Sequence, residues 1–334
     1  MRSPGARLAR RLRRSSPRGV VLCYHRVAGP RPDPAALDLP PAVFAEQMRV
    51  LRERAQPMPL SAFEAARRAG QLPPRAVAVT FDDGYADNLH AALPVLASLD
   101  VPATVFVTTA GVDARGEFWW DTVARACCVP HALPDSLSLR GSGAAFRVAL
   151  DAGTRAQPAR EGGEGLAARQ QLYAAIAGWL RAQDAEVRAA AVAELVEWAG
   201  AESAPPDANR TLRVDELQAL ARSPLIEIGS HSATHPVLGL LPEAAQREEC
   251  AASRASLARW LGVAPAHFAY PFGDGAGVTR EVEAAARSAG YAAAYTTAAQ
   301  AAWRWNRAMA VPRFAMQAWD GAEFGRRLDQ WFDE

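Results

Sequence analysis

Short apolar runs of strand length alternate with segments of helical periodicity along most of this 334-residue chain. The alternation is typical of an α/β protein with a mostly parallel sheet, and a chain of this length can bury a large core. The predicted strands cover residues 20–24, 76–81, 103–108, 225–229, 267–270, 291–296 and, as a short one, 309–314. The predicted helices cover residues 41–54, 61–70, 86–99, 214–222, 242–261 and 278–290.

The stretch from residue 117 to residue 210 interrupts this alternation. Its centre, residues 140–165, is rich in Gly, Ala and Arg and has little periodicity, whereas residues 172–180 and 186–199 have the pattern of amphipathic helices. We interpret the stretch as a helical insertion between two strands of one barrel or sheet. The predicted organisation is therefore a basic segment, residues 1–18, followed by one domain, residues 19–334.

The first 18 residues carry seven arginines and no acidic residue, although the whole chain has a formal net charge of only +1. Such a segment can be a solvated chain end, or it can contact anionic lipid headgroups. Equal pelleting with vesicles by chains with and without residues 1–18 would exclude the lipid contact. Nucleic-acid binding is not expected, because the rest of the chain is acidic and does not interleave aromatic with basic residues.

Export signals and disulfides are not expected either. The basic segment leads into residues 20–24, an apolar run that is too short for the core of a signal peptide and ends at His25. Cys127 and Cys128 are adjacent, and the four cysteines form no Cys-x-x-Cys pair. These features predict a cytoplasmic protein, with peripheral contact at the inner membrane face as an option.

Two polar motifs follow predicted strands. Asp82 and Asp83 come directly after residues 76–81, and Gly84 lets the chain turn immediately after them. His231 and His235 follow residues 225–229. If the second segment is helical, its imidazoles are neighbours about 5–6 Å apart at Cβ and can share one ion. Each motif alone is weak evidence, since Asp-Asp-Gly is also a turn signal.

Taken together, the two motifs supply the parts of a hydrolytic metal site. Catalytic zinc commonly takes two His and one carboxylate, and it keeps one position open for water. One of the two aspartates then remains as a general base, and the residue pattern alone leaves open which one.

The motif at residues 80–84, Thr-Phe-Asp-Asp-Gly, and the motif at residues 231–235, His-Ser-Ala-Thr-His, resemble the first two motifs of the polysaccharide deacetylase family. This family is also known as carbohydrate esterase family four, or the NodB-homology domain. Residues 268–273 resemble the third motif of its poly-N-acetylglucosamine deacetylase branch, and residues 21–27, 118–121 and 311–314 match further features. The resemblance covers roughly residues 18–320 outside the insertion. It implies a distorted (β/α)7-type barrel with the site at the carboxyl ends of the strands.

The resemblance also implies a role for each matching residue. Asp83, His231 and His235 become the ligands of a divalent metal ion, by default zinc, with cobalt or nickel as alternatives. Asp82 becomes the general base. Tyr270, Pro271 and Phe272 border the substrate, and the backbone N–H of Phe272 stabilises the oxyanion.

The chain departs from the family pattern at two points. Many relatives orient the base with an Arg in the third motif, where this chain has Ala269. Arg313 is the candidate substitute, the alternative being a structural arginine. The late histidine that serves as general acid is also missing, since no His follows His267. His25 is the remaining candidate acid, the alternative being a histidine that hydrogen-bonds to backbone at the edge of the core.

The predicted function is metal-dependent removal of the N-acetyl group from N-acetylhexosamine units. The substrate would be a polysaccharide, an oligosaccharide or a lipid-linked glycan precursor, and no obligate protein partner is predicted. The alternatives are cleavage of an O-acetyl ester, an N-formyl group or a cyclic imide, and a carbohydrate-binding relative without activity.

Overall fold

The computed structural model describes residues 17–29, 33–114, 116–156, 164–202 and 207–333. The chain divides into a barrel unit, Met1–Ala28, Asp38–Val112 and Leu212–Glu334, and an insertion unit, Gly29–Leu37 and Asp113–Thr211. Residues 1–16 of the predicted basic segment lie outside the described residues, so the lipid contact and the location at the membrane face stay predictions. No described helix combines the length and the apolar character needed to cross a membrane.

Within the described residues, the barrel unit is built on a nine-stranded sheet. Its strands follow the order β11-β10-β9-β6-β5-β1-β12, with β13 also paired to β1 and β4 to β5. All neighbours are parallel except β12, which runs antiparallel to β1. The bounds are β1 (Arg18–Tyr24), β4 (Gln56–Pro57), β5 (Ala76–Phe81), β6 (Ala103–Val107), β9 (Ile226–Ser230), β10 (His267–Ala269), β11 (Ala293–Tyr295), β12 (Ala302–Trp303) and β13 (Phe314–Ala315).

A short segment near the end of the chain links the two sides of this curled sheet. Val311 forms a parallel bridge to Tyr295 at the end of β11, and Phe314 pairs in parallel with Leu22 of β1. Residues 311–315 therefore lie between β11 and β1 and complete a distorted barrel. The predicted fold class is confirmed. The predicted strand 309–314 shortens to β13 and this single bridge.

The central strands are apolar on both faces because helices cover the outside and side chains fill the inside. Every residue of β5 is buried, as are the last six of β1. Continuous apolar runs of this kind are expected in parallel sheets that are buried on both faces. This continuous apolar run explains why the strand predicted over residues 76–81 has the same bounds as β5.

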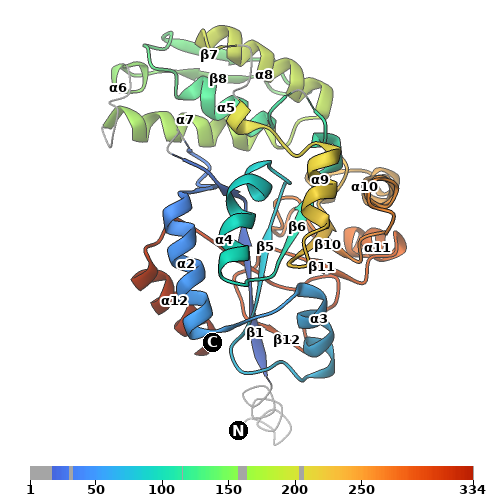
Figure 1. Cartoon of the computed structure of the whole chain (residues 1–334). Helices are drawn as coiled ribbons and strands as arrows, with labels where there is room; N and C mark the ends of the chain where they lie inside the picture. The colour runs from blue at the N-terminus through green and yellow to red at the C-terminus, as the bar shows by residue number, and fades with distance from the viewer. Residues whose placement is uncertain (1–16, 30–32, 115, 157–163, 203–206, 334) are drawn as a thin grey trace, which may run out of the picture. The chain divides into compact units, whose positions relative to one another are not determined.

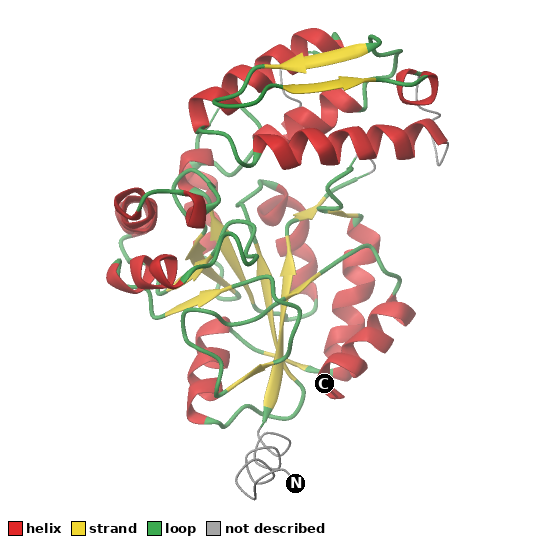
Figure 2. Cartoon of the chain, turned by 180° about the vertical axis from the view of Figure 1, so that it is seen from behind, coloured by secondary structure: helices red, strands yellow, loops and turns green. Residues whose placement is uncertain are grey.

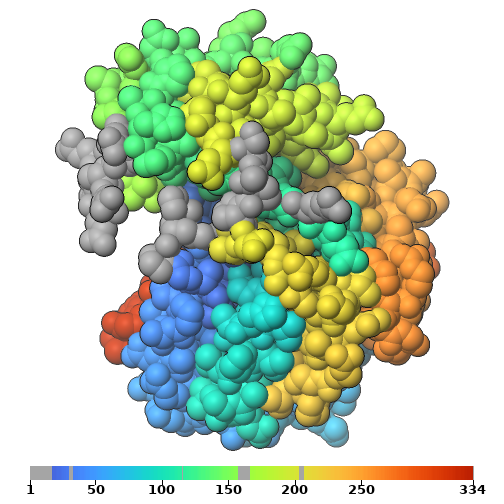
Figure 3. Space-filling view, turned by 45° about the horizontal axis from the view of Figure 1, so that its top comes forward, coloured from blue at the N-terminus to red at the C-terminus, as the bar shows by residue number. Residues whose placement is uncertain are grey.

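Helices surround the sheet (Figure 1). In the space-filling view, α2, α4, α9 and α10 follow one another around the barrel unit (Figure 3). The bounds are α2 (Pro41–Arg54), α3 (Leu60–Ala69), α4 (Leu93–Ser98), α9 (Val214–Ala221), α10 (Glu243–Leu261), α11 (Arg280–Ser288) and α12 (Gly321–Asp333). Short helical turns of the barrel unit are η1 (Asn88–Ala92), η2 (Thr109–Gly111) and η4 (Leu238–Leu240), and a small separate sheet pairs β2 (Arg26–Val27) with β3 (Asp38–Leu39). A further turn, η3 (Asp207–Asn209), belongs to the insertion unit.

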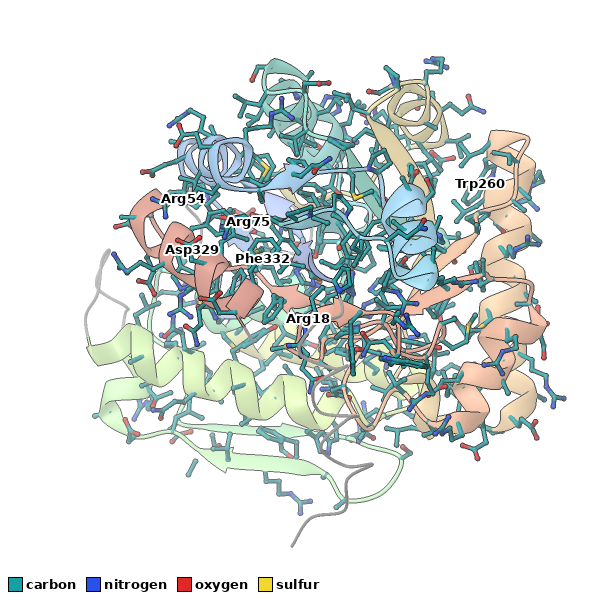
Figure 4. All side chains as sticks on the ribbon, turned by 90° about the horizontal axis from the view of Figure 1, so that it is seen from below. Arg18, Arg54, Arg75, Trp260, Asp329 and Phe332 are labelled. Carbon is teal, nitrogen blue, oxygen red and sulfur yellow. The ribbon has the colours of Figure 1, made fainter. Side chains whose placement is uncertain are left out.

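Two helical features differ from the sequence prediction. The helix expected over residues 86–99 is a π-helical turn, η1, followed by α4. Pro94 explains the change, since it has no N–H to donate to the preceding turn. Helix α12 was not predicted. It packs on α2, and Asp329 of α12 accepts from Arg54 at 3.0 Å and from Arg75 at 2.5 Å (Figure 4).

The insertion unit has its own apolar core. Its elements are α5 (Trp119–Cys127), β7 (Ser136–Leu139), β8 (Phe146–Ala149), α6 (Ala152–Arg155), α7 (Glu164–Leu180) and α8 (Ala185–Ala199). The insertion contains an antiparallel hairpin, β7-β8, whose second strand lies in the stretch that has little periodicity in the sequence (Figure 2). Arg169 of α7 is fully buried and donates to the backbone carbonyls of Cys127 and Thr154, at 2.7 and 2.6 Å. Besides the two expected helices, which are α7 and α8, the insertion therefore contains a hairpin and the unpredicted helices α5 and α6.

Candidate active site

The polar motifs meet at the carboxyl ends of neighbouring strands in the barrel unit. Asp82 and Asp83 follow β5, and His231 follows β9, with β6 between the two strands. The backbone N–H of Asp82 donates to the carbonyl of Tyr24 at 2.9 Å, and that of His231 donates to Val107 at 2.9 Å. The backbone hydrogen bonding of the sheet therefore extends to Asp82 and His231 and fixes the backbone positions from which their side chains project.

Several residues of this site have left-handed backbone, which non-glycine residues rarely adopt. The φ angles are 73° at Asp83, 66° at Ser232, 59° at His235 and 61° at Phe272. Such conformations cost free energy, and they concentrate where a function requires a specific geometry.

The segment from His231 to His235 is a loop, so the helical case considered from the sequence does not apply. Strand β9 runs on to Ser230, and the left-handed turn at Ser232 then reverses the chain. The hydroxyl of Ser232 accepts the backbone N–H of His235 at 3.0 Å. The two imidazole rings still lie together, with centroids 4.9 Å apart. The left-handed turn at Ser232 therefore brings the two imidazoles together without a helix.

Asp83, His231 and His235 form one buried cluster. Oδ1 of Asp83 lies 3.4 Å from Nε2 of His231 and 3.3 Å from Nε2 of His235. The three candidate ligand atoms lie within 4.8 Å of one another. Among the described residues, Oδ1 of Asp83 has no partner that meets hydrogen-bond geometry. A buried carboxylate oxygen aimed between two imidazole nitrogens matches the donor set of a divalent cation.

His231 is a neutral imidazole with a defined tautomer. Burial lowers the pKa of His231 to about 4, an effect that the nearby Asp82 only partly offsets. Nδ1 of His231 lies 2.9 Å from the carbonyl oxygen of Ala269, which can only accept, so Nδ1 carries the proton. The lone pair of Nε2 therefore faces Asp83. A backbone carbonyl that fixes the tautomer in this way is typical of metal-binding histidines.

Arg313 holds the carboxylate of Asp82 through two hydrogen bonds. Nη1 donates to Oδ1 and Nη2 to Oδ2, both at 2.7 Å, and both side chains are buried. Nε of Arg313 donates to the carbonyl of Thr296 at 3.2 Å. Burial raises the pKa of Asp82, but the charge and hydrogen bonds of Arg313, together with His231 and His25, outweigh burial and hold that pKa well below its usual range. Asp82 is therefore ionised and fixed in orientation.

Strand β1 brings two further side chains to Asp82. His25, at the end of the strand, is partly exposed, and its ligand atom lies within 4.8 Å of those of Cys23 and Asp82. The thiol of Cys23 donates to Oδ2 of Asp82 at 3.4 Å. Burial raises the pKa of Cys23 well above its ordinary value, so the thiol stays protonated and acts as a donor.

The third motif contributes mainly backbone. The side chain of Tyr270 is buried in an apolar cluster and donates its hydroxyl proton to the carbonyl of Met309 at 2.9 Å, so only its backbone is available to a substrate. Phe272 places its ring 4.9 Å from that of His235. Pro271, between them, is buried. The role of the Phe272 N–H as an oxyanion donor stays a prediction.

Two residues of the site were not singled out from the sequence. Cys23 could have been found, since strand alternation puts it on the same side of β1 as His25. Glu249 of α10 contacts the loop between the two histidines, and no local pattern links it to them.

Comparisons with known proteins agree with this arrangement. The family model described as polysaccharide deacetylase matches residues 69–133 and 167–294. No curated protein sequence gave a match.

Three solved structures have a similar fold. A deacetylase from Streptococcus pyogenes, PplD, in complex with acetate is 16% identical with a TM-score of 0.59, and the match covers 95% of this chain and 99% of that one. IcaB from Ammonifex degensii is 19% identical with a TM-score of 0.59, over 95% and 97% of the two chains. A de-N-acetylase from Aggregatibacter actinomycetemcomitans is 14% identical with a TM-score of 0.55, over 93% and 100%.

The family model spans more than half of the chain, and it includes Asp82 as well as Asp83, His231 and His235 of the cluster. The chain therefore belongs to the polysaccharide deacetylase family and is a carbohydrate deacetylase.

Proposed function

We propose that this protein is a metal-dependent hydrolase that removes acetyl groups from N-acetylhexosamine units of a glycan. The observation that carries the proposal is the cluster of Asp83, His231 and His235 beside an ionised Asp82. Three buried ligand atoms lie within 4.8 Å of one another, and a second, fixed carboxylate is adjacent to them. Structural sites do not require that extra carboxylate, but hydrolysis requires a base.

The donor set fits a divalent cation, with zinc as the default and cobalt or nickel as alternatives. When bound, such a cation lowers the pKa of a coordinated water and polarises the acetyl carbonyl. Asp83, His231 and His235 would hold it, and Nε2 of His231 is already free of its proton. The neutral imidazole and the buried carboxylate reduce the rearrangement that binding requires.

The remaining residues move protons and orient groups. Asp82 accepts the proton of the attacking water, and Arg313 keeps the Asp82 carboxylate ionised and aimed at that water. His25 returns a proton to the departing amine, whose basic nitrogen cannot leave as an anion. The backbone N–H of Phe272 donates to the oxyanion, an interaction typically worth about 2.7–4 kcal/mol.

An amide of N-acetylglucosamine is the preferred substrate because of the third motif. Residues 268–273 resemble that motif in the poly-N-acetylglucosamine deacetylase branch. The O-acetyl ester, N-formyl and cyclic imide alternatives use the same chemistry on a different acyl group. Comparing acetate release from N-acetylglucosamine oligomers with turnover of these three substrates distinguishes them.

Removal of the metal should abolish deacetylation. We expect the chelator-treated protein to release no acetate from N-acetylglucosamine oligomers, and we expect zinc, cobalt or nickel to restore activity. Metal analysis should find about one ion per chain, since the cluster offers one set of three ligands. Full activity of protein shown by metal analysis to be metal-free would exclude the proposal.

Replacing His25 should separate amide from ester substrates. His25→Gln is expected to lower kcat on N-acetylglucosamine oligomers by about 10²–10⁴-fold, because the amine leaves without a placed proton donor. Turnover of p-nitrophenyl acetate should fall much less, since p-nitrophenolate leaves without being protonated. His90→Gln serves as the matched control, because His90 is exposed and pairs with Glu216 away from the cluster. An equal loss on both substrates would argue against His25 as the acid.

A further inference from the structure

The loop between the two candidate metal ligands is held by one carboxylate from another element. Glu249 of α10 accepts the backbone N–H groups of Ala233 and Thr234 on Oε2, both at 2.9 Å. Its Oε1 accepts the hydroxyl of Thr234 at 2.6 Å. These residues are the second and third after His231, and they directly precede His235. Glu249 therefore contacts the part of the loop that sets the separation of the two imidazoles.

The opposite side of the same loop is held by backbone. The N–H of Thr109 donates to the carbonyl of Ser232 at 3.2 Å, and the N–H of Ala110 donates to the carbonyl of Ala233 at 2.8 Å. Backbone donors and acceptors both need partners. The turn η2 donates to the loop carbonyls, and Glu249 accepts from the loop N–H groups.

Helix α10 is a rigid support for Glu249. Ser253, one turn further along α10, receives a hydrogen bond at 2.7 Å from Ser230, the last residue of β9. The hydroxyl of Tyr291 donates to the carbonyl of Cys250 at 3.1 Å. The strand that leads into the loop and the helix that holds its tip are therefore tied together, so the position of Glu249 relative to His231 is fixed.

We propose that Glu249 is a positioning residue that sets the affinity of this protein for its divalent cation. Glu249 fixes the left-handed turn of the loop and thereby holds His231 and His235 with both Nε2 atoms facing Asp83. The inference rests on the proposed metal-dependent function and extends it to a residue outside the cluster. Outer-shell partners of metal ligands typically change metal affinity by about 10–100-fold when they are removed.

The contacts of Glu249 are partly exposed, so a role in positioning the loop can be distinguished from a contribution to the stability of the whole protein. Water can replace the carboxylate at the N–H groups of Ala233 and Thr234, since Thr234 is exposed and Ala233 and Glu249 are only partly buried. Removal of Glu249 should therefore change the thermal unfolding of the metal-free protein little. Water does not fix the loop in one conformation, so the cation must order the loop when it binds, and affinity falls.

The test measures cobalt binding by the full chain. Metal-free wild-type, Glu249→Ala and Glu249→Gln proteins are titrated with Co²⁺ in competition with a chelator, and the visible absorption of bound Co²⁺ reports ligand geometry. Glu248→Ala and Glu248→Gln are the matched controls, since Glu248 is the exposed preceding residue of the same helix. Thermal unfolding of the metal-free proteins is measured alongside.

We expect Glu249→Ala to weaken Co²⁺ binding by about 10–100-fold and to alter the absorption spectrum, while both Glu248 variants stay within twofold of wild type. Glu249→Gln should weaken binding less, because its amide oxygen can accept both backbone N–H groups and its NH2 can donate to the hydroxyl of Thr234, although without the charge. It also carries the test if the alanine variant does not fold. Unchanged affinity and spectrum in the Glu249 variants would overturn the positioning role alone. Absence of binding by the wild-type chain would instead overturn the metal site itself.

Discussion

Replacing Asp82 by Asn is expected to lower the rate of acetate release from N-acetylglucosamine oligomers by about 10²–10⁴-fold. The amide has nearly the same shape as the carboxylate, but it cannot take a proton from water at neutral pH. The cluster of Asp83, His231 and His235 is unchanged, so the variant should still contain its metal. The measurement is kcat/KM together with the metal content of the same preparation.

Asp83→Asn is the matched comparison for this experiment, because the two aspartates are adjacent and have different proposed roles. That change should remove metal and activity together, whereas Asp82→Asn should remove activity alone. If Asp82→Asn instead kept its rate within a few-fold, another group would be the base. If both variants lost metal equally, the two aspartates would have to share the ligand role.

Replacing Arg313 by Met is expected to lower the free energy of unfolding by about 3–5 kcal/mol at neutral pH. The change leaves the carboxylate of Asp82 buried without its countercharge, and burial then raises the pKa of Asp82. Pairing with Arg313 lowers the pKa of Asp82 in the folded protein. The stabilisation is therefore fully present above the ordinary pKa of an aspartate, and it is lost progressively as the pH falls from there through the lowered pKa. Urea unfolding of the wild type and the variant at neutral pH measures the difference.

A double variant gives this prediction its control. Arg313→Met combined with Asp82→Asn removes both charges, so it should lose clearly less stability than the sum of the two single losses. Arg54→Met is the exposed comparison, because its 3.0 Å ion pair with Asp329 has both side chains 46% exposed and should contribute only about 0–1 kcal/mol (Figure 4). Additive losses in the double variant would mean that Arg313 and Asp82 do not act as a pair.

The sequence predicted the parts of the fold that depend on local pattern. Strand β5 could be predicted from its composition because all of its residues are buried and most are apolar. The rule that sites lie at the carboxyl ends of parallel strands predicted that Asp82, Asp83 and His231 lie at the same end of the barrel. The pairing of Arg313 with Asp82 could be named only as a candidate, because it depends on how the barrel closes. That closure is set by two short pairings, one at Val311 and one at Phe314.

Other features could not be derived because local signals were ambiguous. A spacing of four residues between His231 and His235 fits a helical turn, but it fits equally a loop that is reversed at Ser232. The loop is selected by the extension of β9 to Ser230 and by the contacts of η2 and Glu249, which come from residues distant in the chain. The hairpin β7-β8 has strands of only four residues, too short for their alternation to be recognised, and β8 lies in the stretch without clear periodicity.

The closing segment, residues 311–315, has a consequence for protein synthesis. During translation, Asp82 and the three candidate ligands are synthesised well before Arg313. A nascent chain that stops before this segment therefore contains the candidate cation ligands but lacks the arginine that pairs with Asp82 in the folded protein. The proposed catalytic site can therefore be complete only after Arg313 has been synthesised.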